Sequence, residues 1–276
     1  MTVPGRVVIL TGSDLQHRFV ARTLAQLPAV AAIVVVQQPQ LPLGRRVRRA
    51  IKRFGLGGMV SRALLKLALK ATGETSRRKA ELARVLGDAK FPNHVPMFRT
   101  TGVNSAQTHA VLRDLAPFIL CVYGTYIVSD ATLSLAELAL NLHTGVSPHY
   151  RGADCEFWAL HEQELKFLGA TVHACTANLD GGAIFGIATV QLEANDGLGA
   201  VFGRCVIAGS ELYKRVVDEL ITSHEIKASP QDLSIGREYK VAMRDWLAEF
   251  RVARLIRRGL IRDYVSHRSS QSLDTA

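Results

Sequence analysis

An alternation of short apolar runs and amphipathic segments constrains the fold of this sequence more than any other feature. The β-branched run Val7–Thr11 is bounded by Gly12, an amphipathic segment reaches Leu27, and residues 31–36 form the next apolar run. Strand, helix and strand in this order are typical of a parallel βαβ unit. Gly12 alone does not make the G-x-G-x-x-G fingerprint of dinucleotide-binding proteins, so a nicotinamide or flavin cofactor is not indicated.

The alternation continues through most of the chain and predicts an α/β fold. We expect further strands at 117–123, 138–143, 169–174 and 184–192, and helices at 103–115, 153–161 and 200–220. The expected architecture is a Rossmann-like, doubly wound, mostly parallel sheet with helices on both faces. Residues 1–222 would form this core, with a basic helical insert at about 41–92, and 223–276 a short helical extension. In the extension we expect a helix at 239–259 and a frayed tail from Ser266.

Composition agrees with a compact protein that has one large domain or a domain with an appendage. The chain has 276 residues, 48% of them hydrophobic, which suffices for a sizeable core. Its four cysteines are widely spaced and form no metal pattern, so we expect reduced core residues in a cytoplasmic protein. Neither a secretory signal nor an apolar run of bilayer length is visible.

Positive charge is concentrated in the insert. The net charge is +10, and the stretch from Leu41 to Lys70 contains no acid and nine bases: Arg45, Arg46, Arg48, Arg49, Lys52, Arg53, Arg62, Lys66 and Lys70. Bases recur every four residues beside leucines in its second half, which predicts a helix with a cationic stripe next to an apolar one. A solvated helix face, steering of an anionic substrate and docking to an anionic membrane surface all stay open. Nucleic acid is disfavoured, because Phe54 is the one aromatic residue in this stretch.

A candidate site follows the apolar run at 138–140. Asn141 and His143 are two residues apart, so both side chains leave the same face of a strand end. His173 lies in a later strand, and the turn after that strand carries Asp180. No lysine, serine or cysteine nucleophile is poised beside this amide, imidazole and carboxylate, which argues against covalent catalysis. The set fits direct transfer between two bound substrates.

A zinc site is the rival chemical interpretation of the same region. Its ligands would be Asp180 and a choice among four histidines: His143, His149, His161 and His173. The spacing matches no metal signature such as H-E-x-x-H, so we expect no metal.

The candidate site belongs to a longer ordered set of motifs. In chain order these are Asn141-x-His143, Ser147-Pro148-x-Tyr150-Arg151-Gly152, Gly169-Ala170-Thr171-Val172-His173 and Leu179-Asp180-Gly181-Gly182. The set resembles the folate-dependent formyltransferases over about residues 5–37 and 115–222, and within that family the chain is most similar to the sugar N-formyltransferases, for the residues outside this core given below. Tyr123-Gly124 with Ile127-Val128 is similar to a further element of that family. Residues 144–147 depart from it, since Thr-Gly-Val-Ser stands where the family has Pro-Ser-Leu-Leu.

The resemblance implies transfer of a formyl group from 10-formyltetrahydrofolate to an amine, without a metal. The catalytic residues of the family fall on Asn141, His143 and Asp180. The resemblance further implies folate contacts at Tyr126, Ile127, Val128, His173, Leu179 and Gly181, and we expect Tyr150 and Arg151 near the acceptor.

The class of amine acceptor is inferred from the parts of the chain outside the core that the family shares. Residues 236–240, Gly-Arg-Glu-Tyr-Lys, are similar to the start of the appendage in sugar N-formyltransferases, and clustered arginines suit phosphate. A nucleotide-linked amino sugar is therefore favoured. Siderophore precursors of the hydroxyornithine type, glycinamide ribonucleotide and methionyl-tRNA stay as alternatives, the last disfavoured because 223–276 predicts helices where that class has a β-barrel. A catalytically inactive basic binding protein and a homo-oligomer are also open.

Overall fold

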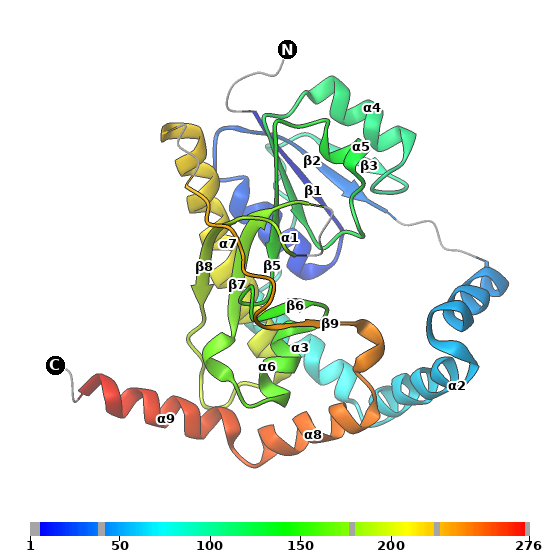
Figure 1. Cartoon of the computed structure of the whole chain (residues 1–276), viewed down its shortest axis with the longest axis vertical. Coiled ribbons are helices and arrows are strands. Elements are labelled where there is room, and N and C mark those ends of the chain that lie inside the picture. Colours follow the sequence, from blue (N-terminus) through cyan, green and yellow to red (C-terminus); the bar gives the residue numbers. More distant parts are fainter. Residues whose placement is uncertain (1–5, 38–41, 177–179, 224–226, 274–276) are drawn as a thin grey trace.

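The computed structural model of the chain describes residues 6–37, 42–176, 180–223 and 227–273. In these residues a seven-stranded sheet has the order β3-β2-β1-β4-β5-β7-β8 (Figure 1). Its strands are β1 (Val7–Thr11), β2 (Val30–Val36), β3 (Met97–Thr100), β4 (Ile119–Tyr123), β5 (Leu138–His143), β7 (Gly169–Ala174) and β8 (Ile184–Thr189). The first five run parallel, and β7 and β8 are added antiparallel. The predicted α/β class with a mostly parallel sheet is confirmed.

Helices cover both faces of the sheet. They are α1 (Leu15–Leu24), α2 (Leu43–Ala71), α3 (Glu74–Leu86), α4 (Ala106–Leu115), α5 (Asp130–Leu133), α6 (Cys155–His161), α7 (Leu198–Ser223), α8 (Trp246–Arg257) and α9 (Leu260–Leu273). Val7 and Ile9 of β1 pack in one cluster with α1 and α7, whereas Val8 and Leu10 pack in another with α4. Successive side chains of a strand point to opposite faces, so a strand buried on both sides must be apolar throughout.

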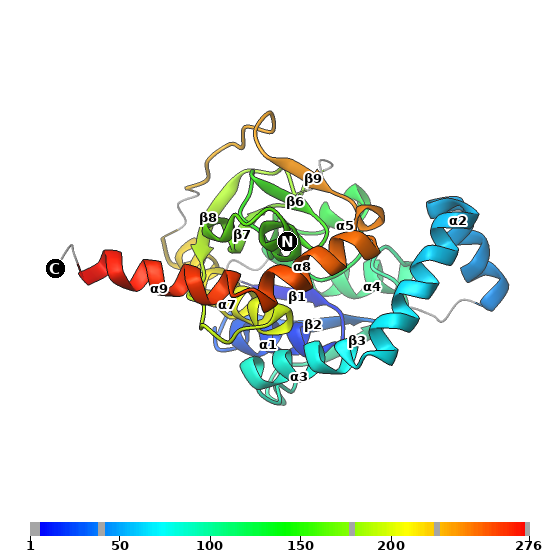
Figure 2. The same ribbon diagram turned by 90° about the horizontal axis from the view of Figure 1, so that it is seen from below.

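The basic insert forms two helices that differ in how they are attached. Helix α3 packs along α7, but no residue of α2 is buried, and both views show α2 standing away from the body (Figures 1 and 2). The helix kinks at Gly55, whose φ of 70° lies in the left-handed region that glycine adopts without strain. The predicted helical character of the insert is confirmed.

The C-terminal extension closes over the segment that follows β5. Strand β9 (Arg237–Tyr239) pairs in parallel with β6 (Tyr150–Gly152), and α8 packs against α6. The expected helix at 239–259 therefore starts only at Trp246, since Arg237 to Tyr239 are engaged in the strand pair. The expectation of a frayed tail from Ser266 is wrong up to Leu273, because α9 is anchored by the buried Ile261.

Two smaller differences concern length. Strand β3 was not predicted, because four residues of mixed polarity at the edge of a sheet carry little periodic signal. The expected strand at 184–192 ends at Thr189. Among the described residues, no helix combines the length and the apolar character needed to cross a bilayer.

Candidate active site

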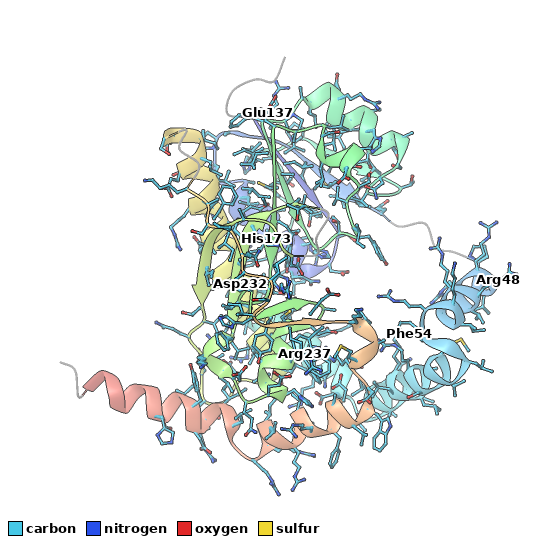
Figure 3. The ribbon with its side chains drawn as sticks, viewed as in Figure 1. Arg48, Phe54, Glu137, His173, Asp232 and Arg237 are labelled. Carbon is cyan, nitrogen blue, oxygen red and sulfur yellow. The ribbon has the colours of Figure 1, made fainter. Side chains whose placement is uncertain are left out.

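The two halves of the motif meet because β5 and β7 are neighbours. Their antiparallel register sets Asn141 opposite His173 and His143 opposite Thr171. Strand β5 also pairs in parallel with β4, so the ends of β4 and β5 open at the same edge of the sheet. This edge is where ligands bind in doubly wound sheets. Figure 3 shows His173 in the interior of the molecule, close to this strand pair.

Asp180 links the two histidines. One carboxylate oxygen, Oδ2, lies 3.4 Å from His143 Nδ1, and the other, Oδ1, lies 3.4 Å from His173 Nε2. The backbone N–H of Gly152 donates a hydrogen bond of 2.9 Å to Oδ2. All three side chains are at most 10% exposed. The structure therefore brings together residues of all four predicted motif segments.

The protonation states follow from this geometry. Burial by itself would raise the pKa of Asp180, but the two histidines and the Gly152 N–H overcome it and lower that pKa to about 2. Asp180 is therefore a carboxylate at neutral pH. Burial lowers the pKa of His143, and the nearby carboxylate offsets only part of this effect. His143 Nε2 donates to the Tyr150 carbonyl at 3.0 Å, which leaves Nδ1 as the basic nitrogen of the neutral ring.

His173 orients Asn141. Its Nδ1 lies 2.9 Å from the carbonyl oxygen of Ala174, and because a carbonyl only accepts, Nδ1 carries the proton. Asn141 Nδ2 lies 3.2 Å from His173 Nε2, so the amide donates to that nitrogen when the nitrogen carries no proton. The amide nitrogen of Asn141 thus has a fixed direction, and its second N–H is available to a ligand.

Thr171 holds the loop that departs from the family pattern. Its hydroxyl donates to the Gly145 carbonyl at 2.7 Å and accepts from the Ser147 N–H at 3.0 Å. A Cβ at Gly145 would lie 2.5 Å from His143 Nε2 and 2.7 Å from Cys155 Cβ, so only glycine fits. The substituted loop is therefore a closely packed support for the His143 ring.

An apolar slot of about 200 Å³ opens beside this cluster. Six of the residues that line it are Tyr126, Ile127, Val128, Asn141, His173 and Asp180. All six are predicted above as folate contacts or catalytic residues from different motifs, and Cys175 and Thr176 also line the slot without having been predicted. Gly181 follows the carboxylate directly in the chain but does not line the slot, and Leu179 lies outside the described residues.

The two residues expected near the acceptor occupy different positions. The Tyr150 ring is buried and stacks on Tyr239, and its hydroxyl donates to Glu164 Oε2 at 2.6 Å. It is the backbone carbonyl of Tyr150 that meets His143. Arg151 Nη2 donates to the Leu233 carbonyl at 3.2 Å. Contact of either side chain with an acceptor stays a prediction.

Only two of the four histidines of the alternative zinc interpretation lie beside Asp180. His143 and His173 flank Asp180, whereas His149 stacks on Phe167 with ring centroids 4.2 Å apart. His161 packs edge-on against Trp158 instead. Within the described residues, no group of three or more potential ligands has metal-binding geometry.

A second cavity, of about 310 Å³, begins one residue beyond His143. Thr144, Asp154 and Glu156 line it on the side of the candidate site, Arg78 and Lys79 on the side of α3, and Arg244 on the side of the extension. Glu156 is buried, and this burial, reinforced by Asp154, raises its pKa to about 7. Glu156 was not predicted as a site residue, although an acid inside the apolar run at 155–160 is a signal that could have found it.

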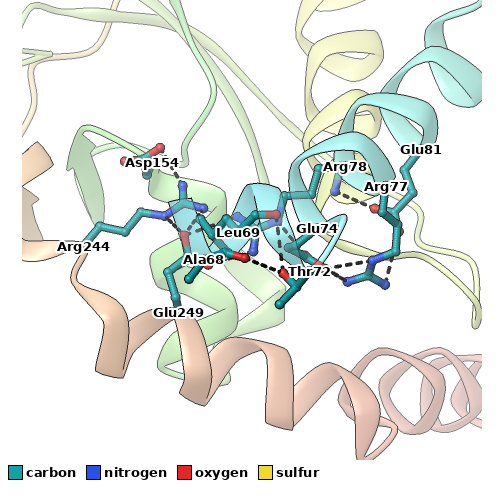
Figure 4. A network of polar contacts seen from close by, with 11 residues as sticks. Ala68, Leu69, Thr72, Glu74, Arg77, Arg78, Glu81, Asp154, Arg244 and Glu249 are labelled. Atoms are coloured by element: carbon teal, nitrogen blue, oxygen red, sulfur yellow. Dashed lines mark hydrogen bonds and ion pairs between the residues drawn. The ribbon is translucent and has the colours of Figure 1, made fainter. Parts of the chain in front are cut away.

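An ion-pair network includes three residues that line this second cavity, Arg78, Asp154 and Arg244 (Figure 4). Glu249 of α8 accepts from Arg78 at 2.7 Å and from Arg244 at 2.8 Å, and Arg244 also donates to Asp154 at 2.8 Å. Arg78 in turn pairs with Glu74 at 2.7 Å. The network ties the insert and the extension to the start of α6, so segments distant in sequence meet beside this cavity.

Comparison with known proteins shows which family the chain resembles over most of its length. The model of the formyl transferase family matches residues 5–217. The methionyl-tRNA formyltransferase of Mycobacterium marinum is 31% identical over 146 residues, which are 52% of this chain and 46% of that protein. The chain thus spans about half the length of the curated relatives it matches.

Solved structures with the same fold include enzymes that act on sugars. A sugar N-formyltransferase from a Shewanella species superposes with a TM-score of 0.54 at 13% identity, covering 86% of this chain and 78% of that one. The sugar 3N-formyl transferase WlaRD, solved in the presence of dTDP and 5-N-formyl-THF, gives a TM-score of 0.53 at 13% identity, covering 86% and 70%. At such identities the likeness shows the shared fold.

Proposed function

The chain belongs to the formyl transferase family, and on this basis we propose that it transfers a formyl group from 10-formyltetrahydrofolate to the amine of a phosphate-bearing acceptor such as a nucleotide-linked amino sugar. The observation that carries the proposal is the cluster of Asn141, His143 and Asp180, joined through His173, beside an apolar slot. The cluster holds a directed amide donor, a basic imidazole nitrogen and a carboxylate, which are the groups that direct transfer to an amine needs.

The slot suits the flat ring system of a folate donor. Ile127 and Val128 offer apolar surface at its rim, while Asp180 and His173 supply polar groups at its inner end. A pterin has the same division, with flat faces and a hydrogen-bonding edge. The presence of 5-N-formyl-THF with WlaRD, a protein of the same fold, supports this assignment of the donor.

Each residue of the cluster has a separate task in the proposed reaction. A bond forms between the amine nitrogen and the formyl carbon, the bond from that carbon to the folate nitrogen breaks, and one amine proton moves to the folate nitrogen. Asn141 donates its second N–H to the formyl oxygen as charge develops there. His143 accepts the amine proton at Nδ1 and returns it to the leaving nitrogen. Asp180, 3.4 Å away, stabilises the imidazolium that exists between these two steps.

The second cavity is the proposed acceptor site. It starts at Thr144, next to the reacting groups, and its carboxyls Asp154 and Glu156 can receive an amine. The exposed Lys79 in the same cavity can pair with an anionic group farther out. An acceptor that carries both an amine and a phosphate would use both ends.

The test is donor consumption with a panel of acceptors. Purified protein is mixed with 10-formyltetrahydrofolate and, one at a time, a nucleotide-linked amino sugar, glycinamide ribonucleotide, hydroxyornithine and methionyl-tRNA, and tetrahydrofolate release is followed. Methionyl-tRNA is included because the relatives in Mycobacterium act on it by name. We expect release to depend on the amino sugar. Release with methionyl-tRNA alone would replace the proposed acceptor, and no release with any amine would contradict formyl transfer itself.

The cavity assignment has its own test. Glu156→Gln should raise the KM for the acceptor about tenfold while leaving the KM for the donor unchanged, because only the amine meets this carboxyl. The exposed Glu238→Gln variant is the matched control. Equal changes in both KM values would place Glu156 outside the acceptor site.

A further inference from the structure

Helix α2 carries large apolar side chains that nothing in the described residues covers. In its first half these are Leu43, Val47 and Ile51, and in its second half Leu56, Val60, Leu64 and Leu67, with exposures from 39% to 73%. We call these seven residues the α2 apolar stripe. The spacing of three or four residues places each group within roughly 80° of the helix circumference. Each half of α2 therefore presents one narrow apolar face to solvent.

The stripe is not the face that attaches α2 to the body. Arg62 donates to the Val241 carbonyl at 2.8 Å and lies over the Phe54 ring at 4.6 Å. Leu65, Lys66 and Leu69 line a cavity with residues of α3, of the loop before α6 and of the extension. At 100° per residue, these positions are on the side of the helix opposite Leu56, Val60, Leu64 and Leu67. Attachment thus leaves the stripe free.

Cations occupy the rest of the circumference in the first half of α2. They are Arg45, Arg46, Arg48, Arg49, Lys52 and Arg53, all exposed, and no acid occurs from Leu41 to Lys70. Figure 3 shows Arg48 on the side of α2 that faces away from the body. A cationic helix with one narrow apolar face and no internal ion pair is suited to an anionic, partly apolar surface.

We propose that α2 docks the protein onto an anionic lipid bilayer, with the α2 apolar stripe at the boundary of headgroups and acyl chains. The positive charge of α2 favours a bilayer over a second copy of the chain as the partner that covers the stripe. Two copies joined through α2 would bring together two segments that hold nine bases and no acid each, whereas anionic headgroups neutralise those bases. The exposed leucines and valines decide between a bilayer and a nucleic acid, because a phosphate backbone gives such side chains no partner. This inference does not depend on the proposed formyl transfer.

Vesicle sedimentation with the full chain tests the proposal. We expect the protein to sediment with vesicles of phosphatidylcholine and phosphatidylglycerol, to stay in solution with phosphatidylcholine alone, and to detach as salt rises. Each base near such a surface strengthens partitioning roughly fivefold, so Arg45→Gln, Arg48→Gln and Arg49→Gln together should weaken it roughly a hundredfold. Val47→Asn with Ile51→Asn should weaken it by about tenfold or more, although the charge is unchanged.

A variant with the same charge change elsewhere is the control. Lys90→Gln, Arg99→Gln and Arg113→Gln remove three exposed cations near β3 and α4, far from α2 in Figure 1. This control should keep nearly full binding, and unchanged unfolding midpoints show that all variants are folded. If the control variant lost vesicle binding as strongly as the α2 variant, net charge alone would explain the effect, and the proposal would be overturned. The proposal is also overturned if the wild-type chain does not bind anionic vesicles. Formation of a dimer or binding of RNA through α2 in place of vesicle binding would be two forms of that result.

Discussion

The buried carboxyl of Glu156 gives the structure a pH dependence that can be measured without any substrate. Burial, with Asp154 nearby, raises the pKa of this group from 4.5 to about 7. Between these two values the folded chain binds a proton that the unfolded chain has lost, so stability falls as pH rises through this window. The difference of the two pKa values, at about 1.4 kcal/mol per pH unit, corresponds to about 3 kcal/mol lost above pH 7.

Glu156→Gln removes this cost, because the amide has the same shape and stays neutral. At pH 5 the variant and the wild-type protein should have similar free energies of unfolding, and at pH 8 the variant should be more stable by about 3 kcal/mol, equivalent to about 6–10 °C in Tm. Urea unfolding at both pH values, with Glu238→Gln as the exposed control, provides the measurement. An equal difference between variant and wild type at pH 5 and pH 8 would refute the assignment of a buried, protonated Glu156.

Three further substitutions test the packing around the site. Glu249→Gln removes the carboxylate shared by two arginines and should lower stability by about 3 kcal/mol in urea unfolding, whereas an unchanged free energy of unfolding would contradict a stabilising role of this network. Gly145→Ala forces its methyl group onto the His143 ring and should lower turnover at least about tenfold. An unchanged rate would show that the loop moves without displacing His143 and would contradict its role as a support for the ring. Ile127→Asp puts a charge at the rim of the slot and should raise the KM for the folate donor about tenfold at unchanged Tm; a changed acceptor KM alone would contradict the slot assignment.

The fold and the central cluster could be predicted because their signals are local. Strands buried on both faces, such as β1 and β4, appear as uninterrupted apolar runs. Asn141 and His143 share a strand, and the ordered motifs supplied the link to His173 and Asp180. What the motifs could not provide is the direction of each hydrogen bond, such as the one from Asn141 to His173.

The second cavity could not be predicted because it is built from distant segments. Arg78, Glu156 and Arg244 are separated by long stretches of chain, and only folding places them around one space. The same reason explains β9, whose three residues form a strand through pairing with β6 and not through their own periodicity. The segment from Ser266 was expected to fray because chain termini are commonly poorly ordered. The buried contact of helix α9 at Ile261, made with other segments, is invisible in the local sequence.

The most direct test of the central claim is the rate of tetrahydrofolate formation by variants of the buried cluster. With a competent amine acceptor, Asn141→Ala, His143→Ala and Asp180→Ala should each lower turnover by a factor on the order of a hundred or more, with Tm close to the wild-type value. Asn93→Ala, an exposed turn residue, should retain full activity. Near wild-type formyl transfer by Asp180→Ala would contradict the account.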